Sequence, residues 1–355
     1  MIADNKLKGE EKMKKKAGKL FFGVLAGLIF LAPGTGLTQG KTTKFPSSLT
    51  MGTSSVGSTF YIMSVGMSNH IAKQTGISMS AEAVGGSDAN VRAMKDKKID
   101  LAMLNAHAIA SGYMGTGQYA KIGKIPLRVF IQGQESLRYI VVRRASGIKS
   151  PADLKGKKLI GKRRAAVDVE MTTNAVLKAY NLSRESVNIL ETAETNESLD
   201  ALKTGAADGA VIQAAVRASN LMELARSIDI DFLSIPDDKL QVMLQDLGPA
   251  FHKSVVPVGI YKDQNYVIQL PSLLTCIVAR SDFQEDLAYT IVKTLMDNQA
   301  TLKSIHAVGR EWTMENTLKN PPAPFHPGAI RYFKEKGLWN ANLEQVQQQL
   351  LKLGS

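Results

Sequence analysis

Two loops of small residues, each joining a short apolar strand to a helix, constrain the fold of this chain most. The first loop covers residues 52–59 (GTSSVGST) and follows a strand predicted over residues 49–51. The second covers residues 85–88 (GGSD) and follows Val84. Such side chains leave backbone N–H groups and hydroxyls exposed at the positive end of a helix, where an anion is stabilised. Both loops could equally be tight turns with serine and aspartate caps, and the local sequence leaves both interpretations open.

Strands and helices alternate from Leu49 onward, an order typical of parallel sheets covered by helices on both faces. Ser150 and Pro151 predict a short helix with serine as its cap and proline at its first position. In the first half we expect strands over residues 78–84, 99–104, 127–132 and 137–143, and helices over residues 60–74, 87–97 and from residue 105.

The second half repeats this pattern. Thr195 is expected to cap the helix over residues 195–203, and Gly205 to close it. Residues 249–264, rich in proline, glycine and histidine, predict a connection. We expect strands over residues 158–160, 187–190, 208–212, 231–235 and 273–279, and helices over residues 169–180, 214–226, 284–304, 328–336 and 343–353.

This order predicts two α/β domains joined by two hinge strands. The first domain comprises residues 41–145 and 271–355, and the second comprises residues 146–270. A chain that crosses twice leaves a cleft between its domains, beyond the carboxyl ends of the strands, where open sheets bind ligands. Proteins of this shape close about the hinge.

The start of the chain, residues 1–40, predicts a cleavable secretory signal peptide. Residues 1–19 contain seven lysines, and residues 20–32 are apolar and uncharged. An apolar run this short falls below the roughly 20 residues that span a bilayer. We therefore expect a periplasmic protein that begins near Gly36 or Gly40; an uncleaved anchor is the alternative, and Met13 is an alternative start.

The charge of the chain restricts its partners. The net charge is +12, and removing residues 1–40 lowers it to +8. A basic balance can indicate nucleic acid, membrane or an anionic ligand. The lysines beyond residue 40 are spread thinly, without interleaved aromatic residues, which argues against nucleic acid.

The residue types that carry catalysis or bind metals form no recognisable pattern. Cys276 is the sole cysteine, so an intramolecular disulfide is impossible. The five histidines lack metal-ligand spacing. With no P-loop, nucleophile elbow or Cys/His pair, we expect no cofactor, no metal and no enzymatic activity.

Six blocks follow one another after Leu49: GTSSVGSTFY, AEAVGGSDANVRAMKDKKIDLAML, LRYIVVRRASGIKSPADLKGKKL, PVGIYKDQ, LLTCIVARSD and HPGAIRYFKEKG. Their order and spacing resemble the TAXI class of solute receptors, the extracytoplasmic binding proteins of tripartite ATP-independent periplasmic (TRAP) transporters. The resemblance implies a two-domain, type II-like periplasmic binding protein fold in a monomer.

The resemblance also implies a function. A small anionic metabolite, such as the dicarboxylates glutamate or 2-oxoglutarate, would be captured and delivered to the membrane subunits of a TRAP permease. Two alternatives remain: an enzyme of the same architecture, for which a reactive His107 would be essential, and a sensory receptor that presents its ligand to a signalling partner.

Matching the family's motifs residue by residue gives candidate ligand contacts in the first half. Tyr61 could instead face the core, and Ser87 could serve only as a helix cap. At His107 many relatives carry an acid, so its replacement weakens the case for an amino-acid ligand. The candidates are Ser54, Ser55, Gly57, Ser58, Thr59, Tyr61, Gly86, Ser87, Asn90, Asn105 and His107.

The loop predicted over residues 161–168 departs most from the family. Relatives carry glycine and serine there, whereas this chain has Lys162-Arg163-Arg164-Ala165-Ala166. A guanidinium can bind a carboxylate through two hydrogen bonds, so Arg163 or Arg164 could clamp the ligand; a basic surface turn that contacts the membrane component is the alternative. The remaining candidates are Ala165, Gln213, Ala215 and Tyr261.

Overall fold

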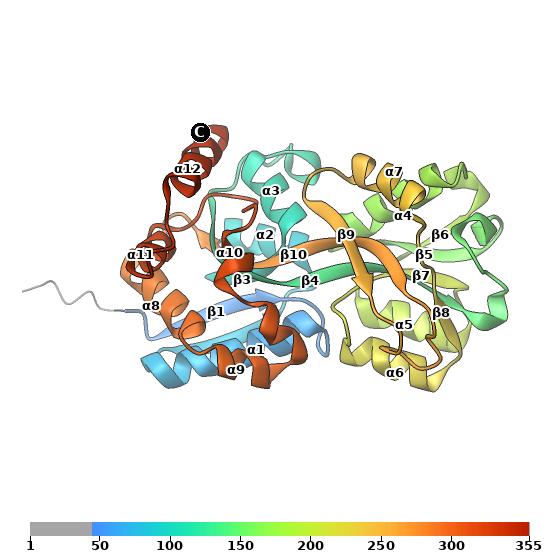
Figure 1. Ribbon diagram of the computed structural model, residues 1–355, viewed down its shortest axis with the longest axis horizontal. Helices are drawn as coiled ribbons and strands as arrows, with labels where there is room; N and C mark the ends of the chain where they lie inside the picture. Colours follow the sequence, from blue (N-terminus) through green and yellow to red (C-terminus); the bar gives the residue numbers. More distant parts are fainter. Residues whose placement is uncertain (1–44, 355) are drawn as a thin grey trace, which may run out of the picture. The chain divides into compact units, whose positions relative to one another are not determined.

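A ten-stranded sheet forms the centre of residues 45–354, the part of the chain that the computed structural model describes (Figure 1). The strand order is β2-β1-β3-β10-β4-β7-β5-β6, with β8 paired to β4 and β9 paired to β10. The predicted signal peptide, residues 1–40, lies outside the described residues.

The elements have the following bounds. The strands are β1 (Ser48–Thr53), β2 (Ser78–Ala83), β3 (Leu101–Asn105), β4 (Leu127–Arg143), β5 (Lys158–Arg163), β6 (Asn188–Thr192), β7 (Gly209–Ala214), β8 (Ile230–Phe232), β9 (Phe251–Val256) and β10 (Ile268–Arg280). The helices are α1 (Thr59–Thr75), α2 (Ser87–Lys95), α3 (Ala106–Met114), α4 (Val167–Ala179), α5 (Thr195–Thr204), α6 (Ser219–Ser227), α7 (Asp237–Leu247), α8 (Glu285–Met296), α9 (Gln299–Ile305), α10 (Met314–Leu318), α11 (Pro327–Glu335) and α12 (Ala341–Gly354).

The hydrophobic core divides the described residues into two lobes. One buried cluster draws almost entirely on residues 45–131 and 276–354, which we call lobe 1. Two further clusters draw almost entirely on residues 137–273, which we call lobe 2. In lobe 2, α4 and α7 cover one face of the sheet and α5 and α6 the other (Figure 1).

Strands β4 and β10 run through both lobes. The first part of β4 pairs with β10, which pairs with β3 of lobe 1, and its last part pairs with β7 of lobe 2. The register between β4 and β10 shifts at Leu274 and Cys276, where the chain passes between the lobes. A bulge at this point lets the strands bend. The predicted domain boundaries stay a prediction, because both strands continue through them.

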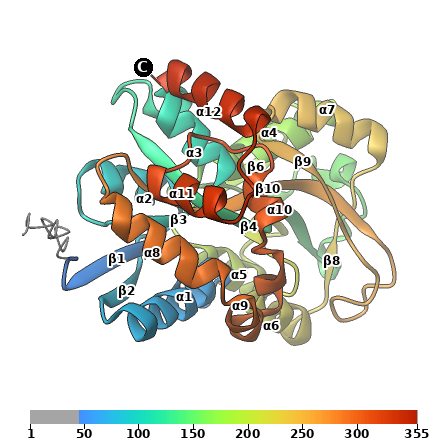
Figure 2. The ribbon, with the colours of Figure 1, turned by 60° about the vertical axis from the view of Figure 1, so that its left-hand side comes forward.

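The C-terminal helices complete lobe 1. Helices α8 and α11 pack against each other, and α8 and α9 pack against α1 (Figure 2). These helices carry much of the buried apolar surface of the lobe, including Leu295 and Phe333. No helix among residues 45–354 is long and apolar enough to cross a membrane.

Several predicted elements have different bounds in the structure. The two strands predicted over residues 127–132 and 137–143 are one strand, β4, because the residues between them stay extended along β10. Residues 249–264 contain β9, which pairs with β10, and the preceding helix α7 was not predicted. The helix predicted over residues 284–304 is two helices, α8 and α9.

Two helix starts also differ from the prediction. Glu194, rather than Thr195, occupies the N-cap position of α5, whereas Gly205 closes the helix in a left-handed conformation as predicted. The helix predicted from residue 214 begins at Ser219, because Ala214 is still paired to Leu137 in the sheet. The short helix capped by Ser150 forms as predicted.

Candidate functional site

A small cavity of about 30 Å³, which we call the cleft cavity, lies where the two lobes meet. Hydroxyl and amide side chains and one arginine provide its polar lining. A water molecule needs at least about 10–15 Å³, so this space accommodates only one or two waters. Its walls are Ser54, Ser58, Thr59, Phe60, Gly86, Ser87, Asn105, Ser136, Arg163, Thr195, Gln213, Ala214 and Ala215.

The first small-residue loop ends in a well-formed cap at α1. The Ser58 hydroxyl accepts a hydrogen bond from the Tyr61 backbone N–H at 3.2 Å, as expected for a serine N-cap. Asn90 holds the other end of the loop, because its amide donates to the Thr53 carbonyl at 3.0 Å. The N-terminus of α1 therefore points at the cleft cavity through Thr59 and Phe60, which line it.

The second small-residue loop brings the lobes into direct contact. A Cβ atom on Gly86 would lie 2.7 Å from an amino group of Arg163 and 2.8 Å from the Ala165 carbonyl oxygen. Only glycine permits backbone and side chain to approach this closely. The GGSD loop of lobe 1 thus packs against residues 163–165 of lobe 2.

Arg163 reaches from lobe 2 into the contact between the lobes. It is the last residue of β5 and only 5% of it is exposed. One amino group donates to the Thr195 hydroxyl at 2.8 Å and to the Gln213 amide oxygen at 2.9 Å. The other donates to the Ser54 hydroxyl at 3.3 Å and to the Gly85 carbonyl. Its Nε has no hydrogen-bond partner among the described residues.

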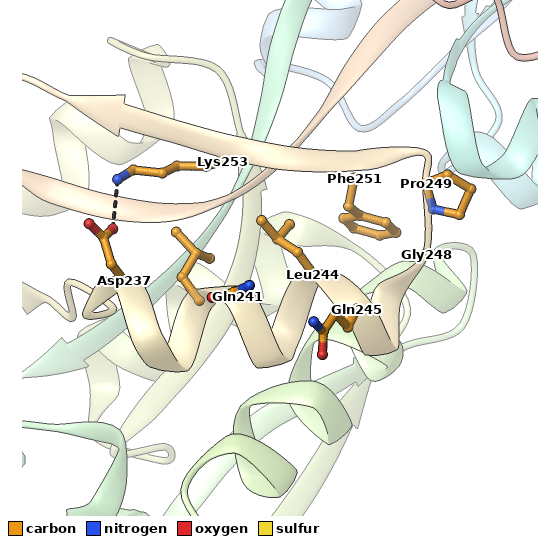
Figure 3. A pocket seen from close by; sticks show the side chains of 9 residues that line it. Asp237, Gln241, Leu244, Gln245, Gly248, Pro249, Phe251 and Lys253 are labelled. Atoms are coloured by element: carbon orange, nitrogen blue, oxygen red, sulfur yellow. Dashed lines mark hydrogen bonds and ion pairs between the residues drawn. The ribbon is translucent and has the colours of Figure 1, made fainter.

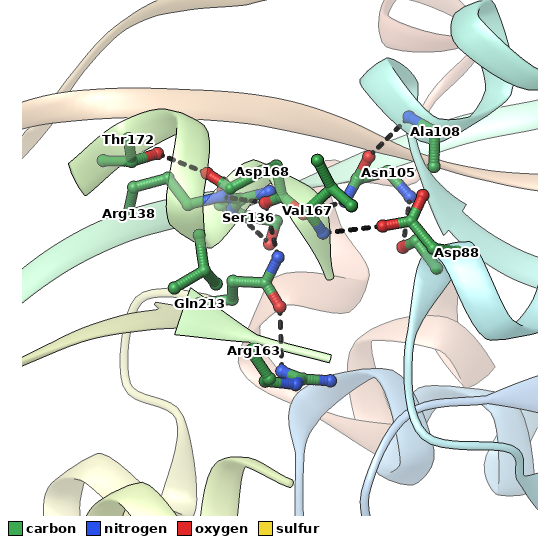
Figure 4. A network of polar contacts seen from close by, with 12 residues as sticks. Asp88, Asn105, Ala108, Ser136, Arg138, Arg163, Val167, Asp168, Thr172 and Gln213 are labelled. Atoms are coloured by element: carbon green, nitrogen blue, oxygen red, sulfur yellow. Dashed lines mark hydrogen bonds and ion pairs between the residues drawn. The ribbon is translucent and has the colours of Figure 1, made fainter. Parts of the chain in front are cut away.

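A buried ion pair orients this arginine through a glutamine (Figure 4). Arg138 of β4 donates from Nε to Asp168 of α4 at 2.5 Å, and both side chains are almost fully buried. The Gln213 amide nitrogen donates to the same carboxylate oxygen. The oxygen of that amide must then face Arg163, because the two ends of an amide have opposite hydrogen-bonding roles.

The ion pair also sets the charge state of Asp168. Burial alone would raise the pKa of Asp168, but the charge of Arg138 and the hydrogen bond from Gln213 outweigh it and lower that pKa. Asn105 adds a hydrogen bond to the carboxylate at 3.4 Å. Asp168 is therefore ionised, and the positive charge of Arg138 balances its negative charge.

Asp88 forms a second contact between the lobes. It lies in the first turn of α2 in lobe 1 and is buried. One of its oxygens accepts from the Tyr119 hydroxyl at 2.5 Å and from the Gln118 amide at 2.6 Å. The other accepts from the Val167 backbone N–H at 2.7 Å, at the N-terminus of α4 in lobe 2. A carboxylate is favoured there by the helix dipole, so Asp88 holds the lobes together.

Loss of the Asp88 charge should open the cleft. In Asp88→Asn, a single amide oxygen cannot serve both the Val167 N–H and the donors of residues 118 and 119. We expect a larger radius of gyration for ligand-free protein in small-angle X-ray scattering. Asp96→Asn at the exposed end of α2 is the matched control and should scatter like the unmodified protein. Identical scattering from all three proteins would show that Asp88 does not hold the lobes together.

The structure brings just over half of the predicted site residues to the cleft cavity. Those that line it are Ser54, Ser58, Thr59, Gly86, Ser87, Asn105, Arg163, Gln213 and Ala215. Ser55 and Ala165 lie beside it in the contact between the lobes: the Ser55 hydroxyl donates to the Glu194 carboxylate, and the Ala165 carbonyl accepts from the Asp88 N–H at 3.3 Å.

The other predicted residues lie away from the cavity lining. His107 packs against Phe251, with 5.8 Å between ring centroids, and burial lowers its pKa. Tyr261 is buried in lobe 2, where its hydroxyl donates to that of Tyr139 at 3.0 Å. The others are Gly57, Tyr61 and Asn90, of which Asn90 packs behind the first loop against Gly52.

The structure separates the two arginines that the sequence left as alternatives. The predicted loop over residues 161–168 is only three residues long, because β5 continues to Arg163, which pairs with Thr192 of β6. The Arg164 side chain is 76% exposed and lies 3.4 Å from Glu191. Arg163 alone of the two reaches the cleft cavity.

Sequence reasoning missed several residues of the site. Ser136, Thr195, Phe60 and Ala214 also line the cavity. Arg138 and Asp168 form the ion pair behind it. Polar residues inside the apolar run of β4 were the signal available for two of them, Ser136 and Arg138.

A separate groove of about 580 Å³ lies between α7 and β9 (Figure 3). Leu240, Leu244 and Phe251 line it, and the ion pair between Lys253 and Asp237, at 2.6 Å, spans one end. All its walls belong to lobe 2, so this groove is not part of the contact between the lobes. Within residues 45–354, no group of three or more His, Cys, Asp or Glu side chains is placed to hold a metal ion.

Three solved structures illustrate what the fold is similar to. PhnD1 from Prochlorococcus marinus (MIT 9301), in complex with methylphosphonate, matches with a TM-score of 0.53 and 12% identity over 83% of this chain and 100% of that one. An ancestral arginine-binding protein bound to arginine matches with a TM-score of 0.46 and 16% identity, over 74% of this chain and 97% of that one. An ABC uptake transporter substrate binding protein from Streptococcus pneumoniae with bound histidine matches with a TM-score of 0.46 and 16% identity, over 74% of this chain and 93% of that one.

Identities this low concern the fold alone. The likeness to PhnD1 confirms the predicted fold class, a two-domain α/β periplasmic binding protein fold. The sequence itself matches the NMT1-like family over residues 51–337, which is most of the chain. This protein therefore belongs to the NMT1-like family.

Proposed function

We propose that this protein is an extracytoplasmic solute receptor that binds a small organic anion between its lobes and delivers it to a membrane permease. The resemblance of its sequence blocks to TAXI receptors supports a TRAP permease as the partner. A dicarboxylate such as glutamate or 2-oxoglutarate is the ligand that we propose.

The observation that carries this proposal is the position of Arg163. Its guanidinium is buried between the lobes, and its Nε–H has no partner among the described residues. Burial lowers the pKa of Arg163, while the carboxylates of Asp168 and Glu194 oppose that shift. An arginine pKa starts so high that the group stays charged. A ligand carboxylate at Nε would complete its hydrogen bonding.

The N-terminus of α1 supplies a second place for negative charge. Thr59 lines the cavity, and its buried hydroxyl has no partner among the described residues. The helix dipole and the free N–H groups of a first turn favour an anion at this point. A dicarboxylate could therefore place one end at Arg163 of lobe 2 and the other at α1 of lobe 1.

Binding requires the lobes to move. Ligand pockets typically measure 300–1,000 Å³, far more than the cleft cavity. Entry must break the contacts of Asp88 with Val167 and of Ser55 with Glu194, and the bulge in β4 and β10 is where the strands can bend. The carboxylates of Asp88 and Glu194 therefore stabilise the closed arrangement when no ligand is bound, and contacts with the ligand must replace theirs.

A thermal-shift and calorimetric screen tests this function. A bound dicarboxylate at a hundredfold excess over its dissociation constant should stabilise the protein by about 2.7 kcal/mol. We expect one dicarboxylate to bind with one-to-one stoichiometry, without turnover, and uncharged analogues of the same length to fail. Failure of every organic anion to shift the melting temperature would contradict the proposal.

The predicted cleavage of the signal peptide can be tested separately. The protein purified from the periplasm should begin close to Gly36 or Gly40, because residues 1–40 have the layout of a signal peptide. Mass-spectrometric sequencing of the N-terminus gives the answer directly. An intact N-terminus on membrane-bound protein would contradict export by cleavage.

A further inference from the structure

A cavity of about 890 Å³, which we call the hinge groove, lies on the other face of the crossing strands from the cleft cavity. Side chains alternate between the two faces of a strand. Along β4, Ser136 lines the cleft cavity, whereas its neighbours Glu135 and Leu137 line the hinge groove. The groove is therefore separate from the proposed solute site.

Both lobes contribute walls to the hinge groove. Lobe 2 supplies Arg217, in the turn between β7 and α6, and the segment from β9 to Ile260. Lobe 1 supplies Arg310, Glu311 and Lys319 from the C-terminal part of the chain. A volume of this size lies in the range of small-molecule sites.

Three cations in the groove keep their hydrogen-bond donors available. The side chains of Arg217, Arg310 and Lys319 make no hydrogen bond or ion pair within residues 45–354, although the charges of Lys319 and Arg310 act on the nearby Glu135 and Glu311. The remaining cation, Lys253, pairs with Asp237 at 2.6 Å. Arg217 also adopts a left-handed backbone conformation, with φ of 63°, that an arginine rarely takes.

The two carboxylates of the groove already have donors. Glu135 accepts from His252 Nε2 at 2.9 Å and from the Ser254 hydroxyl. Glu311 accepts from the Glu135 backbone N–H at 3.0 Å. Both oxygens of Glu135 and one oxygen of Glu311 therefore already have donors, whereas three cations of the groove have none of their donors engaged, and this balance favours an anionic ligand.

Apolar side chains make up the rest of the groove. Leu137, Leu274 and Ile260 form part of its wall. Val258, on the same wall, is 54% exposed. An ordinary small dicarboxylate would leave this surface uncovered.

We propose that the hinge groove binds an amphipathic organic acid, with its carboxylate at Arg217, Arg310 and Lys319 and its apolar part against Leu137, Val258 and Leu274. This proposal does not depend on which solute the cleft takes. Because both lobes form the groove, its occupant also favours one separation of the lobes over others.

Trp312 offers a reporter at this site. It follows Glu311, is fully buried, and donates from its indole nitrogen to Gln134, the neighbour of Glu135, at 3.2 Å. The chain has one other tryptophan, Trp339. Trp339→Phe therefore leaves Trp312 as the single tryptophan, and Arg163→Ala in the same protein removes the proposed anion clamp of the cleft.

The experiment titrates octanoate into this double variant and follows the fluorescence. We expect a saturable change with octanoate and none with acetate, which has the charge without the chain. Adding Arg217→Ala, Arg310→Ala and Lys319→Ala should weaken octanoate binding at least tenfold. The matched control carries Lys121→Ala, Lys149→Ala and Lys155→Ala, which change the net charge equally at exposed sites elsewhere, and should bind within twofold of the parent.

Two results would overturn the proposal. One is the absence of any saturable response to octanoate in the parent protein. The other is equal weakening in the groove variant and in the lysine control, which would mean that only the overall charge matters. Val258→Asp, which places an acid on the apolar wall, should also abolish binding while leaving the cations in place.

Discussion

Arg163→Ala should weaken binding of the dicarboxylate ligand by about a hundredfold or more. The guanidinium is buried between the lobes and lines the cleft cavity. Without it, a ligand carboxylate in the closed cleft would be an unpaired buried charge, and losses of several kcal/mol are usual when one member of such a pair is removed. Calorimetric titration at low and high ionic strength measures the effect.

Two companion variants separate this role from a general charge effect. Arg163→Lys should recover only part of the affinity, because an ammonium cannot make the planar two-bond contact of a guanidinium. Arg164→Ala is the matched control: the same residue type, one position away, with a side chain that is 76% exposed. It should change the affinity by less than about threefold, since exposed charges contribute little and are screened by salt. Equal losses from Arg163→Ala and Arg164→Ala would exclude a specific clamp.

Asp168→Asn should destabilise the protein by about 3–5 kcal/mol, the usual cost of breaking a buried ion pair by removing one partner. Arg138 would keep its charge with no carboxylate beside it, in a position where it is completely buried. Urea unfolding of the mature protein measures the loss. Replacing both partners with leucine should recover part of the stability, because no buried charge then remains unpaired.

A surface pair provides the control for this prediction. Lys253→Ala breaks the exposed ion pair with Asp237 and should cost less than about 1 kcal/mol. Asp168→Asn should also weaken ligand binding, because the Gln213 amide loses the partner that fixes its orientation toward Arg163. A variant as stable as the unmodified protein would contradict the account of the ion pair.

The same ion pair predicts how stability depends on pH. The pKa of Asp168 is lower in the folded protein than in the unfolded chain, where it is about 3.9. The unfolded chain therefore takes up a proton first as the pH falls. The stabilising contribution of Asp168 is complete above that value and is lost as the pH falls through the lowered pKa.

Local patterns allowed much of the fold to be predicted. The small-residue loops marked the ends of β1 and β2 and the starts of α1 and α2, because glycine adopts the positive φ angles that these turns need and Ser58 caps α1. The alternation of strands and helices, together with the resemblance to a receptor family, led to the two-lobed fold class. The sequence did not indicate that the two predicted strands form the single strand β4, because a bulge cannot be recognised from the pattern of apolar residues.

The site was harder to predict, because its contacts join distant parts of the chain. Asp88 looked like an ordinary first-turn residue of α2, and nothing local indicated that its carboxylate would bind the N-terminus of α4. Asp168 and Arg138 are separated by thirty residues and meet only because β4 lies beside the start of α4. Arg163 was named as a candidate, but its choice over Arg164 required the alternation of side chains at the end of β5.

Native mass spectrometry of the protein purified without denaturation tests the central claim most directly. We predict that the unmodified protein and Arg164→Ala carry one small organic acid per molecule, and that Arg163→Ala carries none. Retention of the same organic acid by Arg163→Ala would contradict the account, because the ligand would then bind without the arginine that joins the two lobes.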